Sequence, residues 1–249
     1  MSPDKANTGV PDKAEWFTAT HWSVVLMAGQ ASSPQAAEAL EKLCRTYWYP
    51  LYAYVRRQGH SPHDAQDLTQ EFFARLLARN YLGTVGREKG KFRSFLLAAL
   101  NHFMADERDR ARADKRGGGR VLISLNEDDA ETRYQADLAS PLTPDKIFEK
   151  RWATTLLEQA FAKLREESVA AGNAERFDRL KVFLQEGTDA GDYAAVGSEL
   201  GMAANTAAAA VHRLRQRYKN LVRAEVANTV ASPDEIKEEM NYLLAALGQ

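Results

Sequence analysis

The chain has 249 residues, of which 45% are hydrophobic and 27% are charged. This composition is typical of a globular protein and excludes a chain that is disordered throughout or collagen-like. The longest apolar run, Phe95 to Leu100, is far shorter than the roughly 20 residues of a membrane span, and the charged N-terminus shows no secretory signal. The single cysteine, Cys44, excludes an intrachain disulfide. We therefore expect a cytoplasmic protein without membrane contact.

A nearly neutral total charge hides a partition along the chain. Residues 85–120 contain ten basic and five acidic side chains, and residues 205–223 contain five basic and no acidic ones. Residues 124–150, which lie between them, contain seven acidic and three basic side chains. Two basic segments therefore flank an acidic one, a pattern that the net charge of -1 does not reveal.

The first part of the chain has a helical apolar period. Residues 1–15 predict a loose tail, and residues 22–29 predict a short helix. From Leu40 to Val55 apolar residues recur at spacings of three and four, which predicts a helix with a candidate kink at Pro50. Ser61 followed by Pro62 is typical of the start of the next helix.

Glycines punctuate the middle of the chain. A loop is predicted at residues 82–91, after which a helix restarts at Phe92 and continues into the charged segment 106–116. Three glycines at 117–119, followed by an acidic stretch with two prolines, predict a flexible linker.

The second half begins with a capped helix start at Thr143. Two apolar stripes predict helices, and two short helices broken at Gly201 follow. A long basic helix then ends near Val226, and a final amphipathic helix runs from Ser232 to Leu247. The chain has no alternating strand pattern and no internal repeat. We predict an all-α protein with two helical domains joined by a flexible acidic linker.

Residues 192–217 fit the spacing of a helix-turn-helix, whose second helix enters the major groove of DNA. Asp192 and the pair Asn205-Thr206 are candidate caps, and Gly201 suits the positive φ of the turn. At about 100° per residue, the two faces of the second helix can be assigned. The inner face is Val211, Leu214, Tyr218 and Leu221, and the outer face is Asn205, Ala209, His212, Arg213, Gln216 and Asn220. The alternative is an ordinary helical hairpin with a solvated basic face.

The segment Gly90–Leu96 interleaves aromatic and basic residues beside a glycine loop. Such a pattern suits single-stranded nucleic acid, whose bases stack on aromatic rings while its phosphates pair with cations. The aromatic spacing also fits a helical core. We expect Phe95 and Phe103 to be buried, and the loop and Phe92 to make the contacts.

An edge of one predicted helix carries His60, His63, Asp64, Asp67 and Glu71. These side chains could hold a divalent metal ion, but they also form an acidic rim that a basic partner protein would bind. We favour the rim and predict no metal site. Cys44 fits a small buried residue. Because no nucleophile, zinc, phosphate-loop or dinucleotide pattern occurs, we predict neither enzymatic activity nor a cofactor.

The last predicted helix has an apolar stripe that must pack on something. The stripe consists of Ile236, Met240, Leu243, Leu244 and Leu247. Two readings stay open. The helix either covers the core of the second domain, or it contacts the first domain and holds the two DNA-binding surfaces closed.

Several of these segments together resemble bacterial sigma factors of the extracytoplasmic-function (ECF) type, in the sigma-70 family. Arg45–Tyr54 and Asp64–Phe73 resemble the family's region two, and Phe92–Arg112 resembles its minus-ten helix. Tyr193–Arg217 resembles its region four helix-turn-helix. The opening Thr20–Val25 and the C-terminal extension resemble a subgroup common in planctomycete-type genomes.

The resemblance implies a transcription initiation factor that binds the β′ clamp and β flap of core RNA polymerase and promoter DNA, with an anti-sigma factor as a possible partner. The polymerase-binding residues would be Asp64, Asp67, Leu68, Gln70, Glu71 and Phe72. The minus-ten residues would be Lys89, Lys91, Phe92, Arg93, His102, Arg108, Arg110 and Arg112. The minus-thirty-five residues would be Asn205, Thr206, Ala209, His212, Arg213, Gln216 and Arg217.

The implied layout has five parts. They are an N-terminal tail and short helix (1–34), a region two-like domain (35–114), a linker (115–143), a region four-like domain (144–226) and a C-terminal helical extension (227–249). The acidic linker would mimic nucleic acid in the polymerase channel.

The chain departs from the family at three places. Phe95 stands where the family has a tryptophan in its melting helix. Ala207–Ala210 stand where an aliphatic-lysine-polar-arginine run is usual, and Gly197 stands where alanine is usual. Two other functions stay open: a helix-turn-helix regulator that needs no polymerase, and a metal-dependent hydrolase that uses His60, His63, Asp64 and Asp67.

Overall fold

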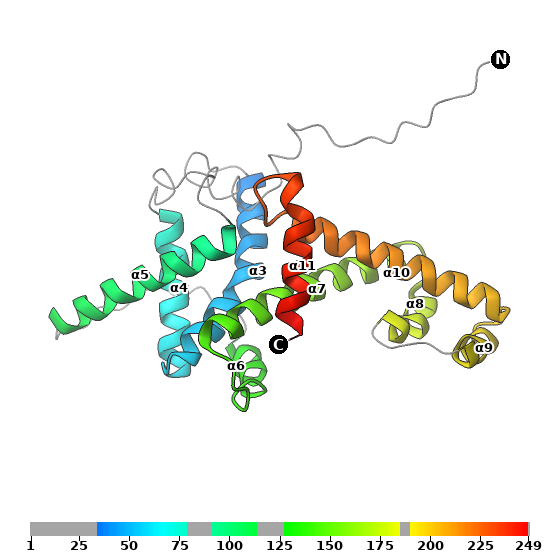
Figure 1. Cartoon of the computed structure of the whole chain (residues 1–249), viewed down its shortest axis with the longest axis horizontal. Coiled ribbons are helices and arrows are strands. Elements are labelled where there is room, and N and C mark those ends of the chain that lie inside the picture. The colour runs from blue at the N-terminus through cyan, green and yellow to red at the C-terminus, as the bar shows by residue number, and fades with distance from the viewer. Residues whose placement is uncertain (1–33, 79–90, 114–126, 185–189, 249) are drawn as a thin grey trace, which may run out of the picture.

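The computed structural model describes residues 34–78, 91–113, 127–184 and 190–248, and these residues form helices and turns without a strand (Figure 1). The all-α prediction is therefore confirmed. The helices are α3 (Pro34–Arg57), α4 (Pro62–Ala78), α5 (Phe92–Ala113), α6 (Glu127–Gln135), α7 (Pro144–Ala170), α8 (Ala174–Leu180), η2 (Lys181–Leu184), α9 (Ala190–Glu199), α10 (Ala204–Ala227), η3 (Pro233–Glu235) and α11 (Ile236–Leu247). The expected tail, the helix at 22–29 and the three glycines at 117–119 lie outside the described residues.

Helix α3 is the centre of the structure. Every residue from Thr46 to Val55 is buried, including Pro50, past which the helix continues. A helix that is apolar on all sides must be covered on all sides. Helix α4 packs on one side of α3, α7 packs along another, and α6 contacts it as well.

One continuous hydrophobic core runs through both halves of the chain. Its largest fully buried side chains include Tyr47 of α3, Phe92 of α5, and Phe148 and Trp152 of α7. Helices α8, α9 and α10 have a small cluster of their own, made of Leu180, Val196, Ala207, Ala210 and Val211. Figure 1 shows α4 and α5 at one end and α8 and α9 at the other, with α7 and α10 reaching between them. The predicted halves thus share a core.

The acidic segment expected as part of a flexible linker is folded from Glu127 onward. Helix α6 buries Ala130 and Tyr134, and Glu131 accepts hydrogen bonds from Arg56 Nε at 2.9 Å and Arg56 Nη2 at 2.7 Å. Tyr52 Oη donates to the same carboxylate at 2.6 Å. The flexible-linker prediction fails for these residues because arginines remote in sequence neutralise the acidic side chains.

The turn after α6 is also bonded to α3 and α7. Arg57 Nε donates to the carbonyl oxygen of Leu142 at 3.1 Å, and the guanidinium also bonds the carbonyl oxygen of Ser140. Asp137 is buried and paired with Arg151 of α7. Residues 115–126 of the expected linker lie outside the described part of the chain.

Helix α11 packs against α7 and α10. Ile236, Leu243 and Ala246 are buried, and Met240 and Leu247 are half-buried. Leu244 is 62% exposed, so its place in the predicted stripe is wrong. The reason is angular: Leu244 lies about 80° around the helix from Ile236, at the edge of the packed face. Among the described helices, none is long and apolar enough to cross a membrane.

Candidate nucleic-acid interface

A groove of about 330 Å³ lies between α4 and α5 and has an acidic rim. Asp64 and Asp67 are exposed on its edge, whereas Leu68 and Glu71 are half-buried. The apolar floor includes Phe103. A groove with this chemistry suits a helix that carries basic and apolar side chains.

Ion pairs connect α4 and α5 beside this groove. Arg75 pairs with Glu71 at 2.8 Å and with Glu107 of α5 at 2.7 Å. Desolvation alone would raise the pKa of Glu107, but hydrogen bonds from Arg75 and Arg110 outweigh it and lower that pKa. Glu71 is therefore engaged within the protein, and the exposed charge of the rim comes from Asp64 and Asp67.

Two expected polymerase contacts, Phe72 and Gln70, are buried and half-buried respectively. Phe72 is 4% exposed, and its ring centroid lies 5.9 Å from that of Phe103, so it is a core residue rather than a contact. Gln70 is half-buried, and its Nε2 atom is buried without a hydrogen-bond partner. Phe72 lies on the face of α4 that packs against α5.

The start of α4 follows the predicted cap. The backbone N–H of Asp64 donates to Ser61 Oγ at 3.1 Å, and Ser61 Oγ donates to Asp64 Oδ2 at 2.7 Å. His63 Nδ1 lies 3.2 Å from Asp67 Oδ2. Within the described ranges, no three His, Cys, Asp or Glu side chains gather as a metal site.

The first turn of α5 is covered rather than open. Phe92 is fully buried with its ring centroid 5.4 Å from that of Tyr47, so the expectation of a base contact there is wrong. Arg93 is 6% exposed and pairs with Glu239 of α11 at 2.7 Å. Lys91 pairs with Glu238 at 2.7 Å. Three residues expected at the minus-ten element are thus engaged within the protein.

Most of the exposed side chains described on α5 lie after its first turn. His102, Arg108 and Arg110 are exposed, and Arg110 pairs with Glu107 at 2.8 Å. Phe103 is buried as expected, whereas Phe95 is only half-buried. Lys89 lies outside the described residues, and Arg112 lies on α5 with its side chain outside the description. Any cationic surface on α5 therefore lies toward its C-terminal end.

The turn between α9 and α10 requires two glycines. Gly201 has a φ of +64°, which only glycine adopts readily. A Cβ atom on Gly197 would lie 2.7 Å from the carbonyl oxygen of Met202, and the N–H of Met202 donates to the carbonyl oxygen of Gly197 at 2.8 Å. The close turn is therefore possible only because residue 197 is a glycine without a Cβ atom.

The predicted caps of these helices are wrong by a few residues. Helix α10 begins at Ala204 after an N-cap at Ala203 that makes no side-chain bond, so Asn205 and Thr206 lie in the first turn. Helix α9 begins at Ala190, which places Asp192 in its first turn. An acidic side chain there complements the helix dipole.

The assigned faces of α10 are confirmed. The inner side chains are buried or half-buried, namely Val211, Leu214, Tyr218 and Leu221. The outer side chains are all exposed, namely Asn205, Ala209, His212, Arg213, Gln216 and Asn220. Ala207 and Ala210 are buried, so at most two positions of the alanine run could present cations to DNA.

Sequence reasoning missed one arginine, Arg176, that the fold brings beside α10. A groove of about 280 Å³ between α7, α8 and α10 is lined by Arg176, Arg213 and Arg217. Arg217 Nε donates to Glu167 of α7 at 2.7 Å, and both side chains are about half exposed. Arg176 belongs to α8, and no motif in the sequence marks it as a neighbour of the other two.

Comparison with known proteins adds one finding. Residues 43–113 match the family model for sigma-70 region 2, a segment that covers most of α3 and all of α4 and α5. Over this segment, which is less than a third of its length, the chain resembles members of the sigma-70 family. No curated protein and no solved structure matches the chain.

Proposed function

We propose that this chain, which carries a sigma-70 region 2 segment at residues 43–113, is a sigma factor of the ECF type. It directs core RNA polymerase to promoters, melts the minus-ten element with its first half and reads the minus-thirty-five element with the helix-turn-helix of α9 and α10. The observation that carries the proposal is the region 2 match, because it covers the helices that form the acidic groove.

The groove between α4 and α5 supports the polymerase contact. Its exposed carboxylates and its apolar floor complement a basic amphipathic helix. In the proposed complex this helix belongs to the β′ clamp. Asp64 and Asp67 attract it, and Leu68 packs against its apolar side.

The outer face of α10 supports the upstream DNA contact. His212, Arg213 and Gln216 are exposed side by side on one helix face. Arginine and glutamine bond base edges in the major groove, and arginine also bonds phosphates. In this proposal the neighbouring guanidinium of Arg176 holds the DNA backbone.

The protein needs no catalytic group for this role, and we propose that it is not an enzyme. Strand separation is driven by the binding of unstacked bases, while the polymerase performs the chemistry. The proposed place of action is the cytoplasm, and an anti-sigma partner belongs to the same proposal.

A regulator that binds DNA without polymerase is the second candidate. It is favoured by one observation, which is that the helix-turn-helix has its own small core and an open basic face. Such a regulator would protect duplex DNA from cleavage without polymerase.

The test combines a pull-down with core RNA polymerase and transcription from a promoter library. A sigma factor is retained by core enzyme and starts transcription at a subset of promoters. Retention without any promoter-specific transcription would contradict the proposal. Protection of duplex DNA by the chain alone, without retention by core enzyme, would favour the regulator.

A further inference from the structure

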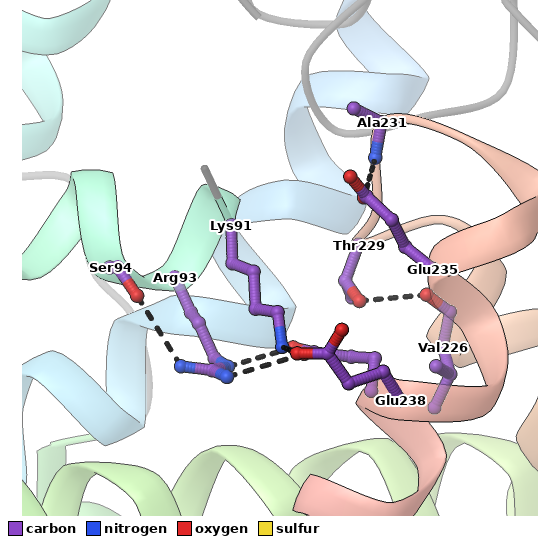
Figure 2. Close-up of polar contacts among 9 residues, drawn as sticks. Lys91, Arg93, Ser94, Val226, Thr229, Ala231, Glu235 and Glu238 are labelled. Atoms are coloured by element: carbon purple, nitrogen blue, oxygen red, sulfur yellow. Dashed lines mark hydrogen bonds and ion pairs between the residues drawn. The ribbon is translucent and has the colours of Figure 1, made fainter. Parts of the chain in front are cut away.

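Helix α11 belongs to the C-terminal half of the chain, but it lies against the start of α5. Figure 2 shows Lys91 and Arg93 pointing from this first turn toward α11, with Lys91 bonded to Glu238. The second carboxylate belongs to Glu239, which lies 2.7 Å from Arg93 Nε and 3.0 Å from Lys91 Nζ. Two consecutive acidic residues of α11 therefore hold two cations expected to contact DNA.

The Arg93 contact has the geometry of an anion site. Its guanidinium donates from Nε and Nη2 to the two oxygens of Glu239, at 2.7 and 3.2 Å. Phosphate oxygens accept the same two-pronged contact from arginine. The guanidinium also lies 3.7 Å from the ring centroid of Tyr242 on α11. The carboxylate of Glu239 thus occupies the place that a phosphate would take.

The Lys91 contact lies at the rim of the same site. Side-chain exposure is 22% for Lys91 and 74% for Glu238. Desolvation alone would lower the pKa of Lys91, but hydrogen bonds to Glu238 and Glu239 outweigh it and raise that pKa. The rim is therefore a charged contact that solvent and a competing anion can reach.

The connection before α11 is short and internally bonded. Thr229 Oγ1 donates to the carbonyl oxygen of Val226 at 2.7 Å, and the N–H of Ala231 donates to Glu235 at 3.1 Å (Figure 2). These bonds fix the turn that brings α11 back from the end of α10. The bonded turn therefore holds Glu238 and Glu239 of α11 next to the start of α5.

We propose that α11 is an internal competitor for the promoter strand, whose Glu238 and Glu239 hold Lys91 and Arg93 in place of the phosphates of single-stranded DNA. This inference rests on the proposed function, and it adds a regulatory role for the C-terminal helix. With α11 in place, the exposed basic side chains described on α5 lie in its C-terminal half. Displacement of α11 frees two more cations at the start of the helix.

The test uses the full chain and a fluorescently labelled single-stranded oligothymidine. Glu238→Lys repels Lys91 at the rim, and because Glu238 is mostly exposed, the change leaves the core intact. Asp234→Lys is the matched control, with the same change of charge at an exposed position of the preceding turn. Binding is measured by fluorescence anisotropy, and opening of residues 236–247 is measured by amide hydrogen exchange.

We expect Glu238→Lys to tighten binding by about two- to fivefold, which corresponds to the loss of one partly exposed ion pair. Asp234→Lys should stay within about a factor of two of the unaltered chain. Glu238→Gln should fall between them. Addition of the oligothymidine should speed amide exchange in α11.

Two results would overturn the inference in different ways. Equal affinities for Glu238→Lys and Asp234→Lys, while Arg213→Ala still weakens promoter binding and core polymerase is still retained, would remove the competitor and leave the proposed function standing. Failure of every variant to bind DNA or core polymerase would remove both.

Discussion

Gly197 shows how one residue decides the close turn between α9 and α10. We predict that Gly197→Ala destabilises the region by about 1–3 kcal/mol, because the added Cβ would lie 2.7 Å from a backbone carbonyl that cannot rotate away. Helix propensity alone predicts the opposite sign, a gain of about 1 kcal/mol. Urea unfolding followed by circular dichroism measures the difference. Ser198→Ala, at the exposed neighbouring position, is the control and should change little.

Cys44 is half-buried, and its thiol is predicted to be inert at neutral pH. Burial, together with a smaller contribution from the nearby Glu41, raises its pKa to about 11. Because the thiolate is the reactive form, alkylation should be slow at pH 8 and should accelerate as the pH approaches 11. Iodoacetamide labelling followed by mass spectrometry measures the rate. Fast labelling of the folded chain at pH 8, equal to that of the urea-unfolded chain, would contradict this prediction.

At the scale of elements, helix α6 depends on one carboxylate. Glu131→Gln should cost about 1–3 kcal/mol at pH 7, because Arg56 and Tyr52 lose a charged acceptor. Hydrogen bonding to Arg56 lowers the pKa of Glu131 below 4.5. The stabilisation is therefore present above pH 4.5 and is lost as the pH falls through the lowered value.

Urea unfolding at several pH values tests this prediction. The two chains should differ at pH 7 and converge in acid. Glu158→Gln removes an exposed ion pair with Arg133 and should cost no more than about 1 kcal/mol. A difference between Glu131→Gln and the unaltered chain that persists unchanged below the lowered pKa would contradict the assignment.

The rim of α4 gives a prediction for binding rather than stability. Asp64→Lys combined with Asp67→Lys should weaken retention by core polymerase about 100-fold, since like charges at an interface cost several kcal/mol. Both side chains are exposed, so the melting temperature should fall by only a few degrees, mainly through the loss of the Ser61–Asp64 bond at the start of α4. Affinity is measured by biolayer interferometry with Asp234→Lys as the control. Unchanged affinity in the double variant would place the polymerase contact elsewhere.

The helices of this chain follow from its apolar periods, but their partners do not. The period of Val211, Leu214, Tyr218 and Leu221 was sufficient to orient α10, because a long helix with one apolar stripe has one way to face a core. Helix α6 escaped prediction because its stability comes from Arg56, 75 residues away from Glu131. Glycines and prolines around it pointed to a linker.

The same limit applies to the candidate site. Basic residues at the start of α5 predicted contacts with nucleic acid, yet Arg93 is covered by Glu239, which is 146 residues away. Nothing in the local sequence distinguishes an exposed arginine from one that a distant helix neutralises. The exposed outer face of α10 was predictable because it needs no partner.

At the scale of the whole molecule, the shared core makes the two halves one unit of stability. Helices α3 and α7 pack along each other, and the buried pair Arg93–Glu239 joins α5 to α11. Opening the protein on polymerase would therefore require the loss of a continuous apolar interface. Two halves on a free tether would need no such step.

The buried pair Arg93–Glu239 allows a direct test of whether the two halves are stabilised together. Glu239→Ala should cost about 3–5 kcal/mol, because Arg93 is left buried without its counter-charge, whereas Arg93→Met combined with Glu239→Met should recover most of the loss. If the core is continuous, Glu239→Ala lowers the amide protection of α3 and α7 together with that of α11. Segment-resolved hydrogen exchange in native conditions makes the measurement. Loss of protection confined to α10 and α11, with α3 unchanged, would mean that the halves are stabilised independently.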